Sequence, residues 1–364
     1  MAGAIDRAGD AAMGNAGKGA SRRPFAGELR LVDPDPRHAS ESKAGGFDRR
    51  AIPADATETF WHAEDGHAIR RIDWPVPAGG ALGSLLFLPG RGDCYEKYLE
   101  TLDHWARIGW KVTASDWRGQ AGSGRLGRDA VTGHIDDFHS WTADLAFLWK
   151  QWTASTPGPH VLAAHSMGGE LALLAVARGE LEPDGLVLSA PMLGFHPAWM
   201  PRLVLHGAAR LMASIGDKRR PAWKWSEKPG EVPAGRERLL THDDARYADE
   251  MWWRAHRPEL VMGPGSWGWV ERAYASFAEL EQPGLLEAVG LPVFIVATDH
   301  DMLVDFRAIE RAARRLPRAE LLIFGVEAHH EILREVDAIR GIALEGIDGF
   351  LALIAAGKLV AASS

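Results

Sequence analysis

The chain has 364 residues, of which 46% are hydrophobic and 25% charged, and its formal net charge at pH 7 is −8. A chain of this length can bury a large core, and it exceeds the usual size of a single domain, so we expect one large domain with an insertion or tail. The acidic balance argues against a nucleic-acid partner, and the one cysteine, Cys94, excludes an intrachain disulfide and a thiolate-rich metal site.

The termini carry no sign of export or of a membrane span. Residues 1–25 contain no apolar signal segment, and the C-terminal apolar stretch Phe350–Ala356 is too short to cross a bilayer. The sequence therefore predicts a cytoplasmic protein, with any membrane contact peripheral to the inner face.

The first predicted unit is a flexible N-terminal extension, residues 1–52. Residues 1–50 are rich in Ala, Gly, Ser, Arg and Asp and show no sustained hydrophobic period. Ordered structure is expected to begin near Thr57, with two short strands at Thr59–His62 and Ile69–Trp74.

Buried strands and helices then alternate along the chain. Apolar runs of the kind that a parallel sheet requires lie at Leu85–Leu88, Val112–Ser115, Val161–Ala164, Leu186–Ser189, Val293–Ala297 and Leu321–Phe324. Helical patterns lie at Tyr98–Ile108, Phe138–Trp152, Glu170–Arg178 and Phe306–Leu316. This alternation predicts an α/β fold with a mostly parallel, doubly wound sheet.

The alternation stops between Pro191 and about Gln282. We therefore predict a helical cap insertion at 191–285, between two parts of the α/β core at 53–190 and 286–364. A single tryptophan there is expected to do no more than stabilise the subdomain, but a tryptophan-rich cap over an active site suits an apolar ligand. The tryptophans are Trp199, Trp223, Trp225, Trp252, Trp253, Trp267 and Trp269.

A candidate nucleophile lies between the apolar run that ends at Ala164 and the helix that follows. The segment 161–178 reads VLAAHSMGGELALLAVAR, with Ser166 among small residues. A strand that turns sharply into a helix lifts its apical residue clear of the sheet, and the small residues Ala164, Gly168 and Gly169 permit the close backbone approach. The pattern predicts a nucleophile elbow at Ser166, although a tight turn with an idle serine gives the same pattern.

Two other serines, Ser214 and Ser266, are also followed by glycine two residues later. Neither comes after a plausible strand with a small residue two positions earlier. We therefore favour Ser166.

A serine nucleophile needs a base and an acid that orients the base, in the chain order Ser, Asp or Glu, His. The acid is expected just after the strand Val293–Ala297, at the sheet edge where the elbow also emerges. There we favour Asp301 over Asp299, and we expect Asp305 to cap the next helix.

The base is expected in the loop after the last strand, where His329 and His330 are neighbours. We favour His330, but the residues alone leave the choice open. Adjacent histidines also suggest a metal site, yet no HExxH spacing supports one, so we predict neither metal nor cofactor.

Acyl transfer also needs N–H donors for the developing oxyanion. One is expected from the backbone of Met167, directly after the nucleophile, and the other from Arg91 in the glycine-containing loop 89–92. Arg91 would donate through its main chain.

Several segments together resemble the serine-hydrolase branch of the α/β-hydrolase fold that includes bacterial lysophospholipases and monoacylglycerol lipases. The resemblance covers about residues 55–355, and it implies Ser166 as nucleophile, Asp301 as acid and His330, directly before Glu331, as base. Departures are modest, because Ala164 and Ala121 stand where glycine is commoner. The matching segments are LPGRGDCYEKY (88–98), SDWRGQAGSGR (115–125), GHIDDF (133–138), AHSMGG (164–169), LTHDDARY (240–247), GPGSWGWV (263–270), TDHDMLVD (298–305) and AHHEIL (328–333).

The resemblance implies an α/β-hydrolase with a helical cap that hydrolyses single-chain lipid esters, either lysophospholipid or monoacylglycerol, through an acyl-enzyme on Ser166. A general esterase, lactonase or transacylase would use the same residues, and a binding protein without turnover is the alternative of another class. The expected partner is a small lipid ester rather than a nucleic acid. The sequence gives no prediction of the oligomeric state.

Overall fold

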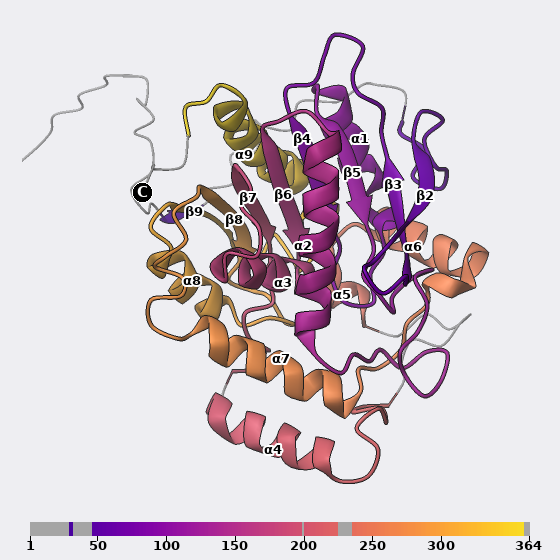
Figure 1. Cartoon of the computed structure of the whole chain (residues 1–364), viewed down its shortest axis with the longest axis vertical. Helices are drawn as coiled ribbons and strands as arrows, with labels where there is room; N and C mark the ends of the chain where they lie inside the picture. Colours follow the sequence, from indigo (N-terminus) through magenta and orange to yellow (C-terminus); the bar gives the residue numbers. More distant parts are fainter. Residues whose placement is uncertain (1–28, 32–45, 199, 225–234, 360–364) are drawn as a thin grey trace, which may run out of the picture.

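The computed structural model describes residues 29–31, 46–198, 200–224 and 235–359 (Figure 1). Within these residues, nine strands form one sheet in the order β1-β9-β8-β7-β6-β4-β5-β3-β2. Neighbouring strands are parallel, except that β3 is antiparallel to both β2 and β5. Central strands β4, β7 and β8 are buried along their whole length, as expected for parallel strands covered on both faces. The predicted α/β fold with a mostly parallel, doubly wound sheet is confirmed.

The predicted strands occur with small shifts at their ends. The bounds are β1 (Leu29–Leu31), β2 (Thr57–His62), β3 (Ala68–Asp73), β4 (Ser84–Leu88), β5 (Lys111–Ser115), β6 (His160–His165), β7 (Gly185–Ser189), β8 (Val293–Thr298) and β9 (Ala319–Phe324). The central strand β4 has β5 on one side and β6 on the other. The strand order reverses there, and open α/β sheets bind ligands at the carboxyl edge beside such a reversal.

Helices cover both faces of the sheet (Figure 1). On one face α1 (Leu99–Arg107) and α9 (Asp337–Ala355) pack into an apolar cluster with the strands. On the other, α2 (Phe138–Ser155), α3 (Met167–Ala177) and α8 (Phe306–Arg315) form a second cluster. Short 3₁₀ turns lie at η2 (Tyr95–Tyr98) and η4 (Ile332–Arg334).

The long connection between β7 and β8, residues 190–292, is called the insertion below and contains helices where the structure describes it. It contains α4 (Arg202–Ser214), α5 (Glu237–Leu240), α6 (Asp244–His256), η3 (Pro258–Leu260) and α7 (Trp267–Leu280). In Figure 1, α7 and then α4 lie beyond the carboxyl edge of the sheet. Among the described helices, none is both long enough and apolar enough to pass through a membrane.

The N-terminal segment contains a strand that the sequence analysis did not predict. Residues 1–52 were expected to form a flexible extension, but Leu29–Leu31 form the edge strand β1, parallel to Leu321–Ile323 of β9. Backbone pairing with β9 provides this order, and a strand of three residues leaves no recognisable hydrophobic period in the sequence. Trp199 and Trp225, which the cap prediction included, lie outside the described residues.

Candidate active site

Ser166 lies at the apex of the turn between β6 and α3. Its backbone has φ 52° and ψ −119°, a left-handed conformation that side-chain-bearing residues rarely adopt. Such strain costs about 1–3 kcal/mol and is concentrated at functional sites. Only glycine fits at position 168, because a Cβ there would lie 2.4 Å from the carbonyl oxygen of Pro89. The small residues therefore let α3 start directly against the end of β4.

Of the two adjacent histidines, His330 faces the serine. Its Nε2 lies 2.9 Å from Ser166 Oγ, and the residue is 4% exposed. His329 stacks instead on His242, with ring centroids 3.7 Å apart, and its amide donates to Glu335. The backbone of α5 holds this loop, since the amide of Glu331 donates to the carbonyl of Leu240 at 2.8 Å. The structure thus places His330, the histidine that the sequence analysis favoured, and not His329 beside Ser166.

Asp301 lies on the far side of the His330 ring. Its Oδ2 is 2.7 Å from His330 Nδ1, and its Oδ1 accepts hydrogen bonds from the amides of Leu303 and Val304. The alternative Asp299 pairs with the exposed His300, and Asp305 accepts from the amide of Arg307 as the N-cap of α8. The structure therefore brings Ser166, His330 and Asp301 together and leaves Asp299 outside the group.

The electrostatics favour a charged Asp301 beside a basic imidazole. Burial opposes charge on His330, but the Asp301 carboxylate and its hydrogen bond outweigh burial and raise the pKa of His330 above its ordinary value. Burial would also raise the pKa of Asp301, but His330 and the two amides lower it overall. Burial and the neighbouring His330 lower the pKa of His165 to about 4, so His165 is neutral at physiological pH.

The predicted oxyanion donors border the same serine. Met167 follows it directly, and Arg91 belongs to the segment Gly90–Asp93, which we call the oxyanion loop. Gly90 passes so close to the nucleophile that a Cβ would lie 3.0 Å from the Ser166 Cβ. The loop is fixed by its other amides, because Gly90 N–H donates to Asp93 Oδ2 and Gly92 N–H donates to Gln120 Oε1.

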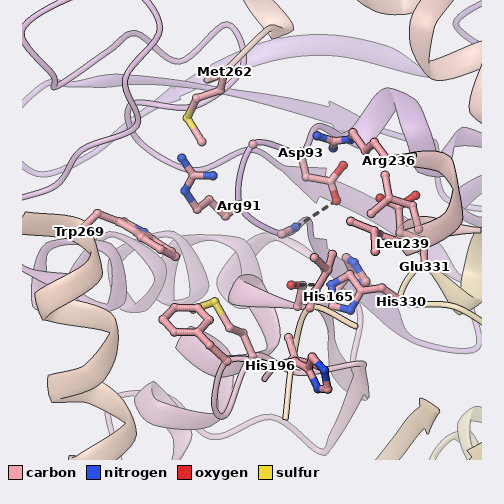
Figure 2. Close-up of a pocket in the computed structure, with 18 of the residues that line it drawn as sticks. Arg91, Asp93, His165, His196, Arg236, Leu239, Met262, Trp269, His330 and Glu331 are labelled. Atoms are coloured by element: carbon pink, nitrogen blue, oxygen red, sulfur yellow. Dashed lines mark hydrogen bonds between the residues drawn. The ribbon is translucent and has the colours of Figure 1, made fainter. Parts of the chain in front are cut away.

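A cavity of about 600 Å³ opens above Ser166, between the core and the insertion (Figure 2). Its walls include Met192, Phe195 and Leu239. Of the predicted cap tryptophans, Trp223, Trp267 and Trp269 line this cavity. Trp252 and Trp253 belong instead to α6 and pack with the core cluster that contains α1 and α9. The cavity is concave and rich in apolar side chains, as sites for apolar ligands usually are.

The sequence analysis missed a group of buried ions beside the site, which we call the buried charge cluster. It consists of Asp93, Lys97, Glu250, Glu331 and Arg334. Lys97 Nζ lies 2.9 Å from Asp93 Oδ1 and 3.1 Å from Glu250 Oε2, and it also binds Glu331. The cluster joins the oxyanion loop, α6 and the segment 325–331 after β9, which we call the His330 loop. Each of these charged residues looks like solvated surface in the sequence, so no local signal marked the cluster.

The two other serines of the sequence analysis have local structural roles. Ser214 is exposed and donates to the carbonyl of Leu211. Ser266 caps α7 by accepting from the amide of Trp269, and it also bonds His134.

Two groups of described residues offer ligand atoms suited to a metal ion. In the first, Asp93, His165 and Glu331 lie within range of one another, but the Lys97 ammonium already binds both carboxylates. The second consists of His242, His329 and Glu335. Their geometry does not favour coordination, because the two imidazoles stack face to face and their in-plane lone pairs cannot converge without rotation. The absence of a metal or cofactor stays a prediction.

Comparisons with known proteins agree with this architecture. A family model described as serine aminopeptidase, S33, matches residues 80–337. Lysophospholipase L2 of Escherichia coli K12 is 30% identical over 285 residues, covering 73% of this chain and 79% of that protein.

Solved structures show the same fold. A soluble variant of monoglyceride lipase from Saccharomyces cerevisiae has a TM-score of 0.65 at 20% identity and covers 84% of this chain and 97% of its own. Monoacylglycerol lipase from Paleococcus ferrophilus has a TM-score of 0.58 at 17% identity and covers 78% of this chain and 98% of its own. The predicted resemblance to serine hydrolases of the α/β-hydrolase fold is confirmed, and the chain belongs to the serine aminopeptidase S33 family of that fold.

Proposed function

We propose that this protein is a serine carboxylic-ester hydrolase that cleaves single-chain lipid esters, either lysophospholipid or monoacylglycerol, through an acyl-enzyme on Ser166. One observation carries the proposal: Ser166, His330 and Asp301 form a continuous line of contacts of 2.9 Å and 2.7 Å at the wall of the apolar cavity. This geometry supports activation of a serine by a base that is itself oriented by a carboxylate.

In the proposed reaction, Ser166 Oγ attacks the ester carbonyl while His330 Nε2 takes the hydroxyl proton. Asp301 stabilises the resulting imidazolium, and the amides of Met167 and Arg91 donate to the oxyanion. His330 then returns the proton to the leaving alcohol, and the acyl group stays on Ser166. Water repeats the sequence, releases the fatty acid and regenerates the serine, so no cofactor is required.

The lipid substrate is supported by the cavity and by the relatives. A cavity of about 600 Å³ walled by Met192, Phe195, Leu239 and Trp269 has room for an acyl chain, whereas an acetyl group would leave most of it unfilled. The matching proteins are named lysophospholipase L2 and monoglyceride lipase. Both names denote cleavage of a lipid with one acyl chain.

The aminopeptidase name of the family model has weaker support in this chain. An aminopeptidase needs a negative group for the free amine of its substrate, and Asp93 and Glu331 do line the cavity. However, Lys97, which also lines the cavity, binds both carboxylates, so their charge is already compensated. We therefore infer an ester rather than an N-terminal peptide.

We further propose that the protein acts in the cytoplasm and contacts the inner face of the membrane peripherally through α4. This helix exposes Leu203, Val204 and Leu211, with Leu203 85% exposed, and Ile215 directly after it is exposed as well. It lies outside α7, whose residues Trp267 and Trp269 line the cavity (Figure 1). An apolar helix face at this place would bring a lipid surface close to the site.

The first test removes the nucleophile. Ser166→Ala is expected to lower kcat for p-nitrophenyl dodecanoate by a factor on the order of 10⁶, the scale seen when a triad serine is lost. It should also abolish labelling by a fluorophosphonate probe. Ser214→Ala is the matched control, because this exposed serine bonds only locally in α4 and its loss should leave both readouts unchanged. Retained activity or labelling in Ser166→Ala would refute the proposed nucleophile.

The second test concerns the substrate. Wild-type protein is assayed on lysophosphatidylcholine, monoacylglycerol, p-nitrophenyl esters from acetate to dodecanoate and an amino-acid p-nitroanilide. We expect kcat/KM to rise with acyl length and to be negligible for the anilide. A preference for acetate would contradict the lipid substrate while leaving Ser166 as the nucleophile.

A further inference from the structure

The side chain of Arg91 leaves the oxyanion loop and enters the insertion. Its guanidinium carbon lies 5.1 Å from the ring centroid of Trp223 and 4.8 Å from that of Trp269. Its Nη2 also donates a 2.8 Å hydrogen bond to the carbonyl of Gly263. Figure 2 shows this side chain pointing toward Met262 and Trp269 and away from His330. All of these partners belong to the insertion.

The aromatic pair is arranged around the cation. Trp223 and Trp269 meet edge to face, with ring centroids 6.4 Å apart, and both present a surface to the guanidinium. A cation over a tryptophan face contributes about 0.5–2 kcal/mol, more where water is excluded. With the bond to Gly263, Arg91 therefore connects the oxyanion loop to two separate parts of the insertion.

The same loop is also held by hydrogen bonds of the amides that flank Arg91, one within the loop and one to the core. Gly90 N–H donates to Asp93 Oδ2 at 3.3 Å, and Gly92 N–H donates to Gln120 Oε1 at 2.7 Å. The backbone of Arg91 thus lies between one bond within the loop and one bond to Gln120 of the core, while its side chain bonds the insertion. Any displacement of the guanidinium therefore acts on a residue whose amide is one of the two predicted oxyanion donors.

We propose that Arg91 is a positioning residue: its side chain, clasped by Trp223, Trp269 and Gly263, ties the oxyanion loop to the insertion and so fixes the position of its own main-chain N–H. The proposal rests on the proposed ester hydrolysis. It makes the insertion a part of the apparatus that stabilises the transition state, in addition to its role as a wall of the cavity.

The test is the effect of Arg91→Met on two esters, p-nitrophenyl acetate and p-nitrophenyl dodecanoate. Loss of a whole oxyanion donor costs about 10²–10³ in rate, so a displaced donor should lower kcat by roughly 10–100-fold, and by the same factor for both esters. KM should change little, because the interaction exists only in the transition state. The affinity for a trifluoromethyl ketone, which mimics the oxyanion, should fall in step with kcat/KM.

Two further variants isolate the contact. Trp223→Ala removes the half-exposed ring from the other side of the contact and should lower kcat in the same way, and the double variant should lose less than the product of the two factors. Arg91→Lys keeps the cation but not the fork that reaches Gly263, and it should restore part of kcat.

Arg125→Met is the matched control. Arg125 also joins the core to the same part of the insertion, donating to the carbonyls of Glu259 and Val261, but it starts from a loop outside the site. An equal loss of kcat in Arg125→Met would overturn the proposal, because it would point to attachment of the insertion in general. So would an Arg91→Met variant that keeps kcat on acetate and only raises KM for lysophosphatidylcholine, since that would make Arg91 a ligand of the phosphate. A wild-type protein inactive on all esters would instead refute the proposed function.

Discussion

Two carboxylates neighbour His330, those of Asp301 and Glu331, and they differ in the groups that bind them. Asp301 is bonded by the imidazole and by the amides of Leu303 and Val304, and none of these three groups is a permanent cation. Glu331, the next residue after His330, belongs to the buried charge cluster and binds Lys97 and Arg334. A carboxylate that is already paired with a cation contributes little to the stabilisation of a neighbouring imidazolium. The comparison teaches that the bonding of the carboxylate, and not its distance alone, decides which acid can support a base.

Among the variants that test this comparison, the largest effect is expected at the acid itself. Asp301→Asn keeps the shape but removes the charge that orients and stabilises the imidazolium, so kcat should fall by about 10⁴-fold, as in other triads. Asp299→Asn is the matched control, because Asp299 pairs with the exposed His300 and should be replaceable without loss. Steady-state kinetics on p-nitrophenyl dodecanoate measures both. A larger loss in Asp299→Asn would reverse our assignment of the acid.

Removal of Lys97, the central cation of the buried charge cluster, should let the carboxylates of Asp93 and Glu331 act more strongly on His330, as the carboxylate of Asp301 does. In Lys97→Met, the carboxylates of Asp93 and Glu331 lose their shared cation, and both already act to raise the pKa of His330. In the wild type this pKa is raised, so kcat/KM should fall with decreasing pH with a midpoint above about 6.5. In the variant the midpoint should move to still higher pH. Breaking a buried pair also costs about 3–5 kcal/mol in the free energy of unfolding.

The pH profile separates this electrostatic role from a structural one. Lys111→Met is the control, because it loses an ion pair with Asp73 on β3 but lies away from His330. It should lower the melting temperature without moving the profile. Lys97→Arg keeps the charge and should return the midpoint toward that of the wild type. An unshifted midpoint in folded Lys97→Met would show that the cluster has no electrostatic influence on His330.

The group of Ser166, Asp301 and His330 and the buried charge cluster also differ in how far the sequence predicted them. Ser166, Asp301 and His330 each follow a buried strand, and parallel strands bring their carboxyl ends to one edge, so the loops could be located from strand order alone. The choice between Asp299 and Asp301, or between His329 and His330, depends on tertiary bonds such as that of Glu331 to Leu240, which no local pattern encodes.

The buried charge cluster could not be predicted at all. Asp93, Glu250 and Glu331 come from three distant segments, and each looks in sequence like a solvated charge. Only the packing of α6 and the oxyanion loop against the His330 loop places Lys97 among them. For the same reason the contact of Arg91 with Trp223 and Trp269 was not foreseen, although its backbone role was predicted.

Glu170 in α3 is a buried carboxyl of a further kind, because it has no ion pair with a lysine or arginine among the described residues, unlike the carboxylates of the buried charge cluster. Burial raises its pKa to about 8 against the smaller lowering effect of the Ser276 hydroxyl. The folded protein therefore keeps a proton that the unfolded chain has released, so stability falls as pH rises from about 4.5 to 8. Glu170→Gln removes this linkage without a change of shape.

The smallest of the expected effects is thus a gain in stability. Glu170→Gln should match the wild type near pH 4.5 and exceed it above pH 8 by about 1–3 kcal/mol in the free energy of unfolding, measured by urea denaturation at several pH values. Glu271→Gln is the contrasting control, since burial is outweighed there by Arg272 and His206, which lower the pKa of Glu271. That variant should lose stability above pH 5, because its carboxylate contributes only when charged. If both variants respond to pH alike, the presence of a cation does not decide the protonation of buried carboxyls in this protein, and the contrast between Asp301 and the buried charge cluster loses its physical basis.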